Sequence, residues 1–398
     1  MAVDTKQKVA ASSNHAPFLD FLRASAAFLV VVGHARHLLF ASIATVDKPG
    51  LLLKIFWLAT VLKHEAVIVF FVLSGFLVGG SVLNAMGRKS FDLKNYLIAR
   101  FSRIYIVYVP ALIVTAAAFW IGRNFLTDFG GDSIRPLFAQ AQPDFGGLHG
   151  TLCHLADVQG FLCEEWKQNP GLWSLGYEWV LYLFAPAVLA LIVAPGSRVV
   201  RCAGLTLLVL GAGAMAVNLT EWAFWFGTWF LGVAAWRLSR SWSLPMTAGL
   251  AALAIAVAAM LIAELHMVDQ RRADLIVAIA FALVVACRPL TAFPVLPRFF
   301  DWAASFSYSL YAINLPIIYL TATLLQRTGF PPNEMTPGPR AFLAFGICVA
   351  AATAFAFLLS LVTERQTPRL RAWLKAAMSQ DNRALTPAIG QAPSRSAR

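Results

Sequence analysis

The sequence has 398 residues, of which 59% are hydrophobic and only 13% are charged. Soluble domains usually have about 25% charged residues, so this composition excludes an ordinary soluble protein and indicates a polytopic membrane protein. The formal net charge of +12 would suit nucleic-acid binding only if basic and exposed aromatic residues shared a soluble surface, which this sequence lacks. We therefore expect membrane lipid, and no nucleic acid, among the partners.

Ten segments are long and apolar enough to cross a bilayer, which takes about 20 mostly apolar residues. They are residues 18–40, 63–84, 104–122, 172–194, 201–218, 221–237, 245–263, 273–290, 303–325 and 341–362. The sixth and eighth are short and edged by charges. A polar leader, residues 1–17, precedes the first segment without a signal-peptide cleavage site. These segments predict an all-α polytopic membrane protein with about ten transmembrane helices.

The orientation follows from the distribution of Lys and Arg between the loops. Ten spans place both termini on one side, which holds 20 Lys and Arg residues against 11 on the other. Cytoplasmic loops carry the excess of positive charge, so we expect both termini in the cytoplasm. The tail, residues 364–398, is basic and rich in Pro, Ser and Ala toward its end, which predicts a partly disordered cytoplasmic segment.

The longest loop, residues 123–171, is then outside the cytoplasm and contains Cys153 and Cys163. Two cysteines in an extracytoplasmic loop suggest a disulfide. Two unpaired thiols, or a metal site with His149 and His154, are the alternatives. The spacing matches no standard zinc pattern, so we predict no metal.

The first apolar segment, "FLRASAAFLVVVGHARH", contains Arg23 and His34. Eleven residues of α-helix make three turns plus about 20°, so both side chains share one face, about 16 Å apart along the axis. Arg23 can be a snorkelling anchor and His34 a helix-end residue bonded to a carbonyl. Ionisable residues within a span nevertheless suggest a functional site.

Three further segments place polar residues at or within the membrane. In "FFVLSGFLVGG", Ser74 and Gly75 favour close helix packing. Arg100 and Arg103 lie one turn apart at a predicted cytoplasmic edge, where they either set the topology or bind phosphate. In "GLWSLGYEWVLYLFAP", Glu178 must be paired or protonated.

The ninth segment, "FDWAASFSYSLYAINLPIIY", is polar enough on one face to line a cavity. An Arg, a His and a Glu thus lie within the predicted bilayer. Neutral His is the usual general base near pH 7, and a carboxylate can orient it. The pattern favours chemistry, but it does not identify a substrate.

Five stretches carry a resemblance to a known family: "LDFLRASAAFLVVVGH", "VIVFFVLSGFLVGG", "ARFSRIYIVYVPAL", "GLWSLGYEWVLYLFAP" and "SYSLYAINLP". Together they resemble, in order, the signatures of the membrane-bound acyltransferase 3 family, whose members modify bacterial cell-surface glycans. The last stretch departs from the pattern, because we expect a histidine at Asn314. The matches lie within an expected transmembrane domain of residues 18–363.

The resemblance implies O-acyl transfer, by default of acetyl, from cytoplasmic acyl-CoA to a sugar or polysaccharide hydroxyl outside a bacterial inner membrane. No permanently bound cofactor is expected, and the acceptor and the oligomeric state stay open. His34 would be the general base, with Arg23 and Glu178 as the other catalytic residues. Glu178 would orient His34 or bind an acceptor hydroxyl.

The other site residues fall into two expected groups. Arg100, Arg103 and Ser74 would form the donor site, although an acyl-enzyme on Ser74 is an alternative. The acceptor would contact four residues: Trp173, Ser174, Tyr308 and Asn314. A transporter or flippase that uses the same buried charges is the competing class, and a silent lipid or glycan binder is a third.

Overall fold

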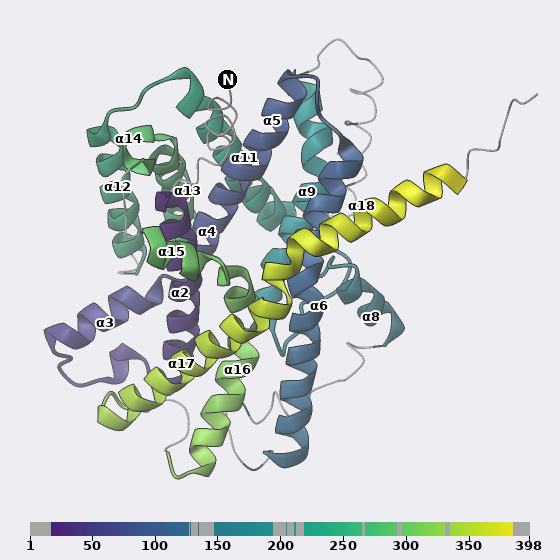
Figure 1. Ribbon diagram of the computed structural model, residues 1–398. Coiled ribbons are helices and arrows are strands. Elements are labelled where there is room, and N and C mark those ends of the chain that lie inside the picture. The colour runs from purple at the N-terminus through teal and green to yellow at the C-terminus, as the bar shows by residue number, and fades with distance from the viewer. Residues whose placement is uncertain are drawn as a thin grey trace, which may run out of the picture.

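The computed structural model describes residues 17–126, 128, 134, 147–193, 204, 211, 219–264, 267–292, 297–330 and 335–384. These residues form a bundle of helices, with two isolated β-bridges and no strand among them (Figure 1). The predicted all-α polytopic membrane fold is confirmed. The predicted leader, up to residue 16, and the end of the tail, residues 385–398, lie outside the described residues.

The longer helices run in the following order along the chain: α2 (Pro17–Leu39), α3 (Leu51–Val61), α4 (Lys63–Ser74), α5 (Gly80–Gly87), α6 (Leu93–Phe125), α8 (Leu148–Leu155), α9 (Trp173–Val193), α11 (Leu219–Ser241), α12 (Met246–Glu264), α13 (Gln270–Ala286), α15 (Pro297–Ala304), α16 (Ser307–Arg327), α17 (Pro339–Val362) and α18 (Thr367–Ala384). Asp side chains cap two of them, because Asp92 accepts from the Asn95 N–H at 3.0 Å and Asp269 accepts from the Arg272 N–H at 3.3 Å.

Seven helices in the described part are long and apolar enough to cross a membrane, and each matches one predicted span. The predicted sixth and eighth spans form α11 and α13, but neither meets that length and hydropathy, and α13 has only 17 residues. Apart from residues 204 and 211, the fifth span, 201–218, lies outside the described residues. A count of ten therefore stays a prediction.

Two helices begin earlier than the sequence predicted. The second span is part of a rod that runs from Leu51 to Gly87, so Lys54 lies in helix, ahead of the predicted start at residue 63. The third begins at Leu93 and not at 104, which places Arg100 and Arg103 inside α6. Charged residues near the start of each helix made the predicted spans begin too late. An apolar pattern ends at a charged residue, whereas an α-helix can continue through it.

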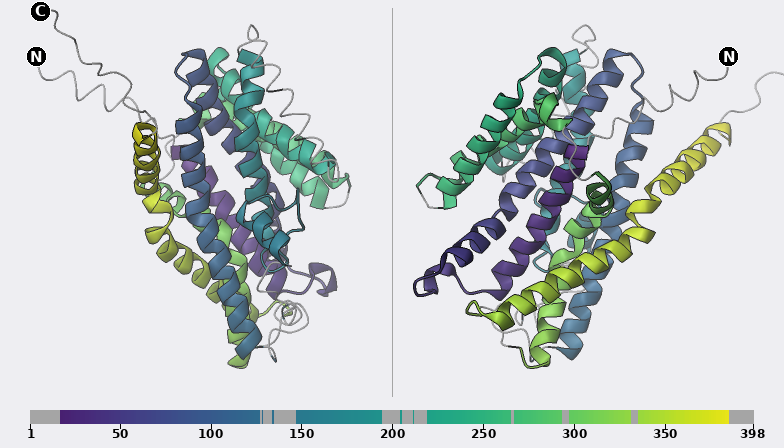
Figure 2. Two further views of the ribbon diagram at one scale, coloured as in Figure 1. Left: turned by 90° about the vertical axis from the view of Figure 1, so that its right-hand side faces the viewer. Right: turned by 60° about the vertical axis from the view of Figure 1, so that its left-hand side comes forward.

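Helix α2 lies at the centre of the bundle, packed against α4, α15, α16 and α17. Helices α12 and α13 pack against each other at one side of the bundle (Figure 2). Helix α18 continues beyond α17 as a diagonal arm that packs across α6. The tail predicted to be partly disordered thus begins with an ordered helix, which the predicted boundary at residue 364 did not reveal.

The rod α3–α5 contains a π-helical turn, Gly75–Gly79, at its closest approach to α11. A Cβ at Gly75 would lie 1.8 Å from the backbone oxygen of Trp229, and a Cβ at Gly232 would lie 2.1 Å from that of Val72. Only glycine fits at these two positions. The predicted packing role of Gly75 is confirmed, and π-helical turns of this kind often lie at functional sites.

The segment between α6 and α9 is fastened to the bundle by buried polar groups. Cys153 and Cys163 form a disulfide, as predicted, and are not two unpaired thiols. The Tyr108 hydroxyl donates to the carbonyl of His154 at 2.7 Å and to Gln159 Oε1 at 3.1 Å. Gln159 Nε2 donates in turn to Asp157 Oδ1 at 3.0 Å. Gln159 Nε2 also donates to the carbonyl of Leu172 at 2.9 Å, and this bond holds the start of α9, where Ser174 and Glu178 follow.

Asp157 is fully buried in this segment, and its Oδ2 has no hydrogen-bond partner among the described residues. Burial, which disfavours the charged form, raises the pKa of Asp157 from 3.8 to about 8, and the charge of Glu178 acts in the same direction. The hydrogen bond from Gln159 opposes the rise.

Candidate active site

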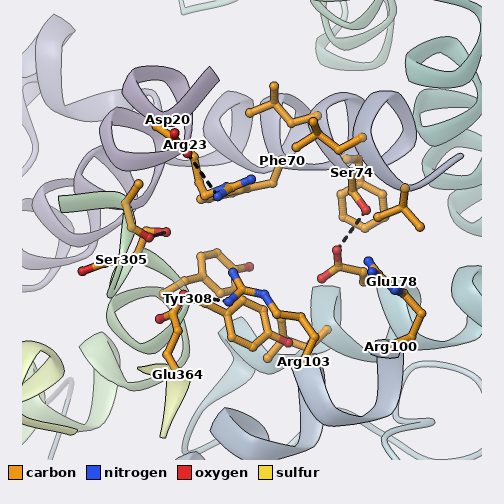
Figure 3. A pocket seen from close by; sticks show the side chains of 18 of the residues that line it. Asp20, Arg23, Phe70, Ser74, Arg100, Arg103, Glu178, Ser305, Tyr308 and Glu364 are labelled. Carbon is orange, nitrogen blue, oxygen red and sulfur yellow. Dashed lines mark hydrogen bonds and ion pairs between the residues drawn. The ribbon is translucent and has the colours of Figure 1, made fainter. Parts of the chain in front are cut away.

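A cavity of about 550 Å³ opens between α2, α4, α6, α9, α16 and the start of α18 (Figure 3). Seven of the predicted site residues line it: Arg23, Ser74, Arg100, Arg103, Ser174, Glu178 and Tyr308. Small-molecule sites typically have volumes of about 300–1,000 Å³, so the cavity is large enough for a substrate.

Two arginines in the cavity are held by carboxylates that the sequence analysis did not select. Arg23 donates to Asp20 Oδ1 at 3.3 Å, one helical turn earlier on α2. Arg103 lies 3.0 Å from Glu364 Oε1. Glu364 Oε2 also accepts from the backbone N–H and hydroxyl of Ser309, at 3.2 and 3.3 Å, so this carboxylate ties α6 to α16.

Ser74 and Glu178 meet across the cavity, as Figure 3 shows. Ser74 Oγ donates to Glu178 Oε1 at 3.0 Å and accepts from Trp229 Nε1 at 3.1 Å. The Tyr182 hydroxyl, one turn after Glu178 on α9, donates to the same carboxylate oxygen and lies 3.0 Å from Ser74 Oγ. The π-helical turn and the close α11 packing therefore position a hydroxyl, a carboxylate and a phenol together.

His34 lies on α2 with Asn314 of α16 as its partner. Their side chains form a hydrogen bond of 2.7 Å between His34 Nδ1 and Asn314 Oδ1. Asn314 is oriented by its own amide, because Nδ2 donates to the carbonyls of Leu310 at 3.1 Å and Tyr311 at 2.7 Å.

This arrangement selects the tautomer of His34. With Nδ2 committed to two carbonyls, the atom of Asn314 that faces the ring is the oxygen, which only accepts. Nδ1 must therefore carry the proton, and in the neutral ring Nε2 holds the free electron pair. Within the described residues Nε2 makes no hydrogen bond, so it is free to accept a proton.

The predicted orienting role of Glu178 is not what the structure shows. Glu178 bonds to Ser74 and Tyr182, whereas Asn314 takes the place beside His34. Asn314 stands where the family resemblance predicts a histidine. An amide at this position supplies the acceptor that Nδ1 needs.

The structure divides the predicted catalytic and acceptor groups. Arg23, Glu178, Ser174 and Tyr308 line the cavity, whereas His34, Asn314 and Trp173 do not. The rings of Phe70 and Tyr311 form an aromatic layer in the wall of the cavity, with centroids 5.6 Å apart. Tyr311 lines the cavity one turn before Asn314, and its hydroxyl bonds to Ser174 Oγ at 2.6 Å. Trp173 packs on Phe71 and Trp225 beside this layer.

The cavity also contains residues that were not predicted as site residues, among them Asp20, Tyr182, Glu364 and Arg371. Asp20 and Tyr182 lie one turn from predicted site residues, a spacing that is visible in sequence. Glu364 and Arg371 belong to the predicted tail, where nothing in the pattern signals a return to the bundle. The described residues contain no His, Cys, Asp or Glu group able to hold a metal ion.

The comparison with curated proteins matches only part of the chain. A curated relative, an uncharacterized protein of Haemophilus influenzae, is 29% identical over 128 residues, which are 31% of this chain and 48% of the relative. The match thus spans about half the length of that relative. No solved structure matches.

The family comparison extends much further. Residues 17–361 match the sequence profile of the acyltransferase domain of acyltransferase family 3. The match contains Arg23, His34, Ser74, Glu178 and Asn314, so the elements that build both groups lie within one domain. We conclude that the chain belongs to acyltransferase family 3, as the motifs of its sequence suggested.

Proposed function

We propose that this protein is an integral membrane O-acyltransferase that moves an acyl group, by default acetyl, from acyl-CoA to a hydroxyl of a sugar or polysaccharide. The observation that carries the proposal is His34 with Nδ1 bonded to Asn314 and Nε2 free to accept a proton. Family membership supports acyl transfer, and the cavity at the N-terminal end of α2 supports a separate donor site.

The chemistry follows from the free nitrogen of His34. Nε2 takes the proton of the acceptor hydroxyl while the hydroxyl oxygen attacks the thioester carbonyl. The carbon–sulfur bond then breaks, the ester forms, and the CoA thiolate receives the proton from the imidazolium. Asn314 keeps the ring in one tautomer and orientation throughout, a role that a carboxylate has in other triads.

The donor and the acceptor approach this centre from opposite sides. The excess of Lys and Arg on one side supports a cytoplasmic N-terminal end of α2, and the proposal takes the membrane to be a bacterial inner membrane. The cavity near Arg23 then faces the cytoplasmic acyl-CoA, and His34, about 16 Å further along the helix, faces the acceptor. In this proposal the pantetheine arm extends from the cavity toward His34.

The cluster of Ser74, Glu178 and Tyr182 lines the cavity proposed for the donor. Glu178 is a base adjacent to the Ser74 hydroxyl, so Ser74 is able to act as a relay that carries the acyl group as an ester. Direct transfer needs fewer steps, because Nε2 of His34 is already free.

One assay separates this function from transport. Purified protein receives acetyl-CoA labelled in the acetyl group together with candidate glycans, and the glycans are then analysed for ester. A transferase yields an alkali-labile labelled ester, whereas a transporter or a silent binder yields none. Comparison of surface polysaccharide masses between deletion and wild-type cells identifies the acceptor.

A further inference from the structure

Helix α18 contributes a cation to the cavity from outside the predicted transmembrane domain. Arg371 lines the same cavity as Arg100, and its helix α18 packs against α6, the helix of Arg100. The Nε atoms of both arginines are buried and have no hydrogen-bond partner among the described residues. The positive charges of Arg100 and Arg103 both act electrostatically on Arg371, so like charges gather at this end of the cavity.

The other arginines of the cavity have partners of opposite charge. Arg23 is paired with Asp20, and Arg103 is paired with Glu364. By contrast, no described carboxylate lies within ion-pairing distance of Arg100 or Arg371. Arg100 instead stacks on the rings of Tyr96 and Tyr182, at 5.9 and 5.5 Å from their centroids.

An unpaired pair of arginines in a partly buried cavity is costly unless an anion binds between them. A guanidinium donates in a planar fork that matches a phosphate group, and two such forks suit a group with a double negative charge. The stacked tyrosine rings hold Arg100 in place without using its donors.

We propose that Arg100 and Arg371 together bind a phosphate of the nucleotide end of acyl-CoA, and that Arg103 does not. Arg103 is a positioning residue that holds Glu364, and through it α16, in place. The inference rests on the proposed function for the identity of the ligand. It makes α18 part of the donor site, although α18 lies beyond residue 361, where the family match ends.

The test uses purified full-length protein in neutral detergent with three donors: acetyl-CoA, its 3′-dephospho form and acetyl-pantetheine. Arg371→Gln is the test variant, and Arg369→Gln, exposed on the same helix and outside the cavity, is the matched control. CoA binding is measured separately by titration calorimetry, with pantetheine as the ligand that lacks every phosphate.

We expect Arg371→Gln to raise KM for acetyl-CoA and weaken CoA binding by roughly 10- to 100-fold, because charge-assisted hydrogen bonds are lost. Transfer from acetyl-pantetheine should stay at the wild-type rate, which also shows that the variant folds. Arg369→Gln should match the wild type with all donors. If Arg371→Gln no longer raises KM when the donor is the 3′-dephospho form, the bound group is the 3′-phosphate. If the variant still raises KM with that donor, the bound group is the diphosphate.

If Arg371→Gln raises KM equally with all three donors, or does not raise KM for acetyl-CoA, the inference is wrong, but the proposed acyl transfer is not contradicted. The same holds if the wild type does not bind CoA. If the wild type binds CoA through Arg371 but transfers no acyl group, the subsite stands and the proposed function fails. Arg103→Gln should lower the melting temperature, and a KM effect limited to phosphate-bearing donors in that variant would also contradict the proposal.

Discussion

The partner of His34 is an amide, and this choice has a measurable consequence. Asn314→Leu removes the acceptor that fixes Nδ1–H, so the ring can rotate and change tautomer. We expect kcat to fall by about 10- to 100-fold, with the KM for the donor unchanged because Asn314 does not line the cavity. Asn314→Asp keeps the accepting oxygen and should retain most activity. Wild-type kcat in the leucine variant would refute the positioning role.

A second residue, Asp157, makes the stability of the protein depend on pH. Its pKa is about 8 in the folded protein against 3.8 for the free side chain, because it is buried. Between these values the folded state holds one proton more than the unfolded state, so stability falls as pH rises through this window and levels off above it.

Asp157→Asn removes this dependence while keeping an oxygen that can accept from Gln159. We expect the melting temperatures of the two proteins in detergent to agree most closely near pH 4 and to diverge toward pH 8, with the variant more stable. Melting curves from pH 4 to pH 9 measure this. Parallel pH profiles would show that Asp157 titrates normally.

At the residue scale, the sequence predicts which residues belong to the site better than it predicts which of them contact each other. Seven predicted site residues line one cavity, because apolar helices leave few places for Arg, Glu and Ser. Their partners are harder to predict: Glu364 and Asn314 come from segments far along the chain, and Glu178 has Ser74 as partner and not His34. Pairing depends on helix rotation and depth, which no local pattern records.

At the scale of elements, the crossing of the rod α3–α5 with α11 depends on two glycines. Gly232→Ala places a methyl group against the backbone of Val72, where no flexible side chain can give way. We expect a loss of roughly 1–3 kcal/mol in stability, together with lower activity because Ser74 is displaced. The measurement is thermal unfolding in detergent.

Gly227→Ala is the matched control on the same helix, since nothing lies within 4 Å of a Cβ there. It should leave the melting temperature unchanged or raise it slightly, because alanine favours helix over glycine. Equal effects of the two substitutions would mean that α11 does not approach the rod as closely as the structure shows.

The elements themselves follow from hydropathy where a helix is apolar throughout. Helices α2, α16 and α17 begin and end within a few residues of the predicted spans, 18–40, 303–325 and 341–362. The pattern fails at α3, at the start of α6 and at α18, where helices continue through charged residues. Those continuations carry Lys54, Arg100 and Arg371, and the two arginines line the cavity, so hydropathy misses helix ends that contribute to the candidate site.

At the scale of the whole molecule, the donor and acceptor sides depend on the orientation in the membrane. Ser90→Cys, exposed between α5 and α6, should react with a membrane-impermeant maleimide only after the cytoplasmic face is opened. Leu148→Cys, whose side chain is 76% exposed at the start of α8, should react in intact spheroplasts. The free cysteines described, Cys287 and Cys348, are buried and give little background. The reverse pattern would invert the proposed donor and acceptor faces.

The central claim is that His34 accepts the proton of the acceptor hydroxyl. The most direct test is the rate of ester formation from labelled acetyl-CoA by His34→Ala, with His37→Ala, exposed one turn later on α2, as the matched control. We predict that His34→Ala lowers kcat by about 10²–10⁴-fold at wild-type abundance and with unchanged CoA binding, while His37→Ala keeps the wild-type rate. A wild-type rate of ester formation in His34→Ala would contradict the account.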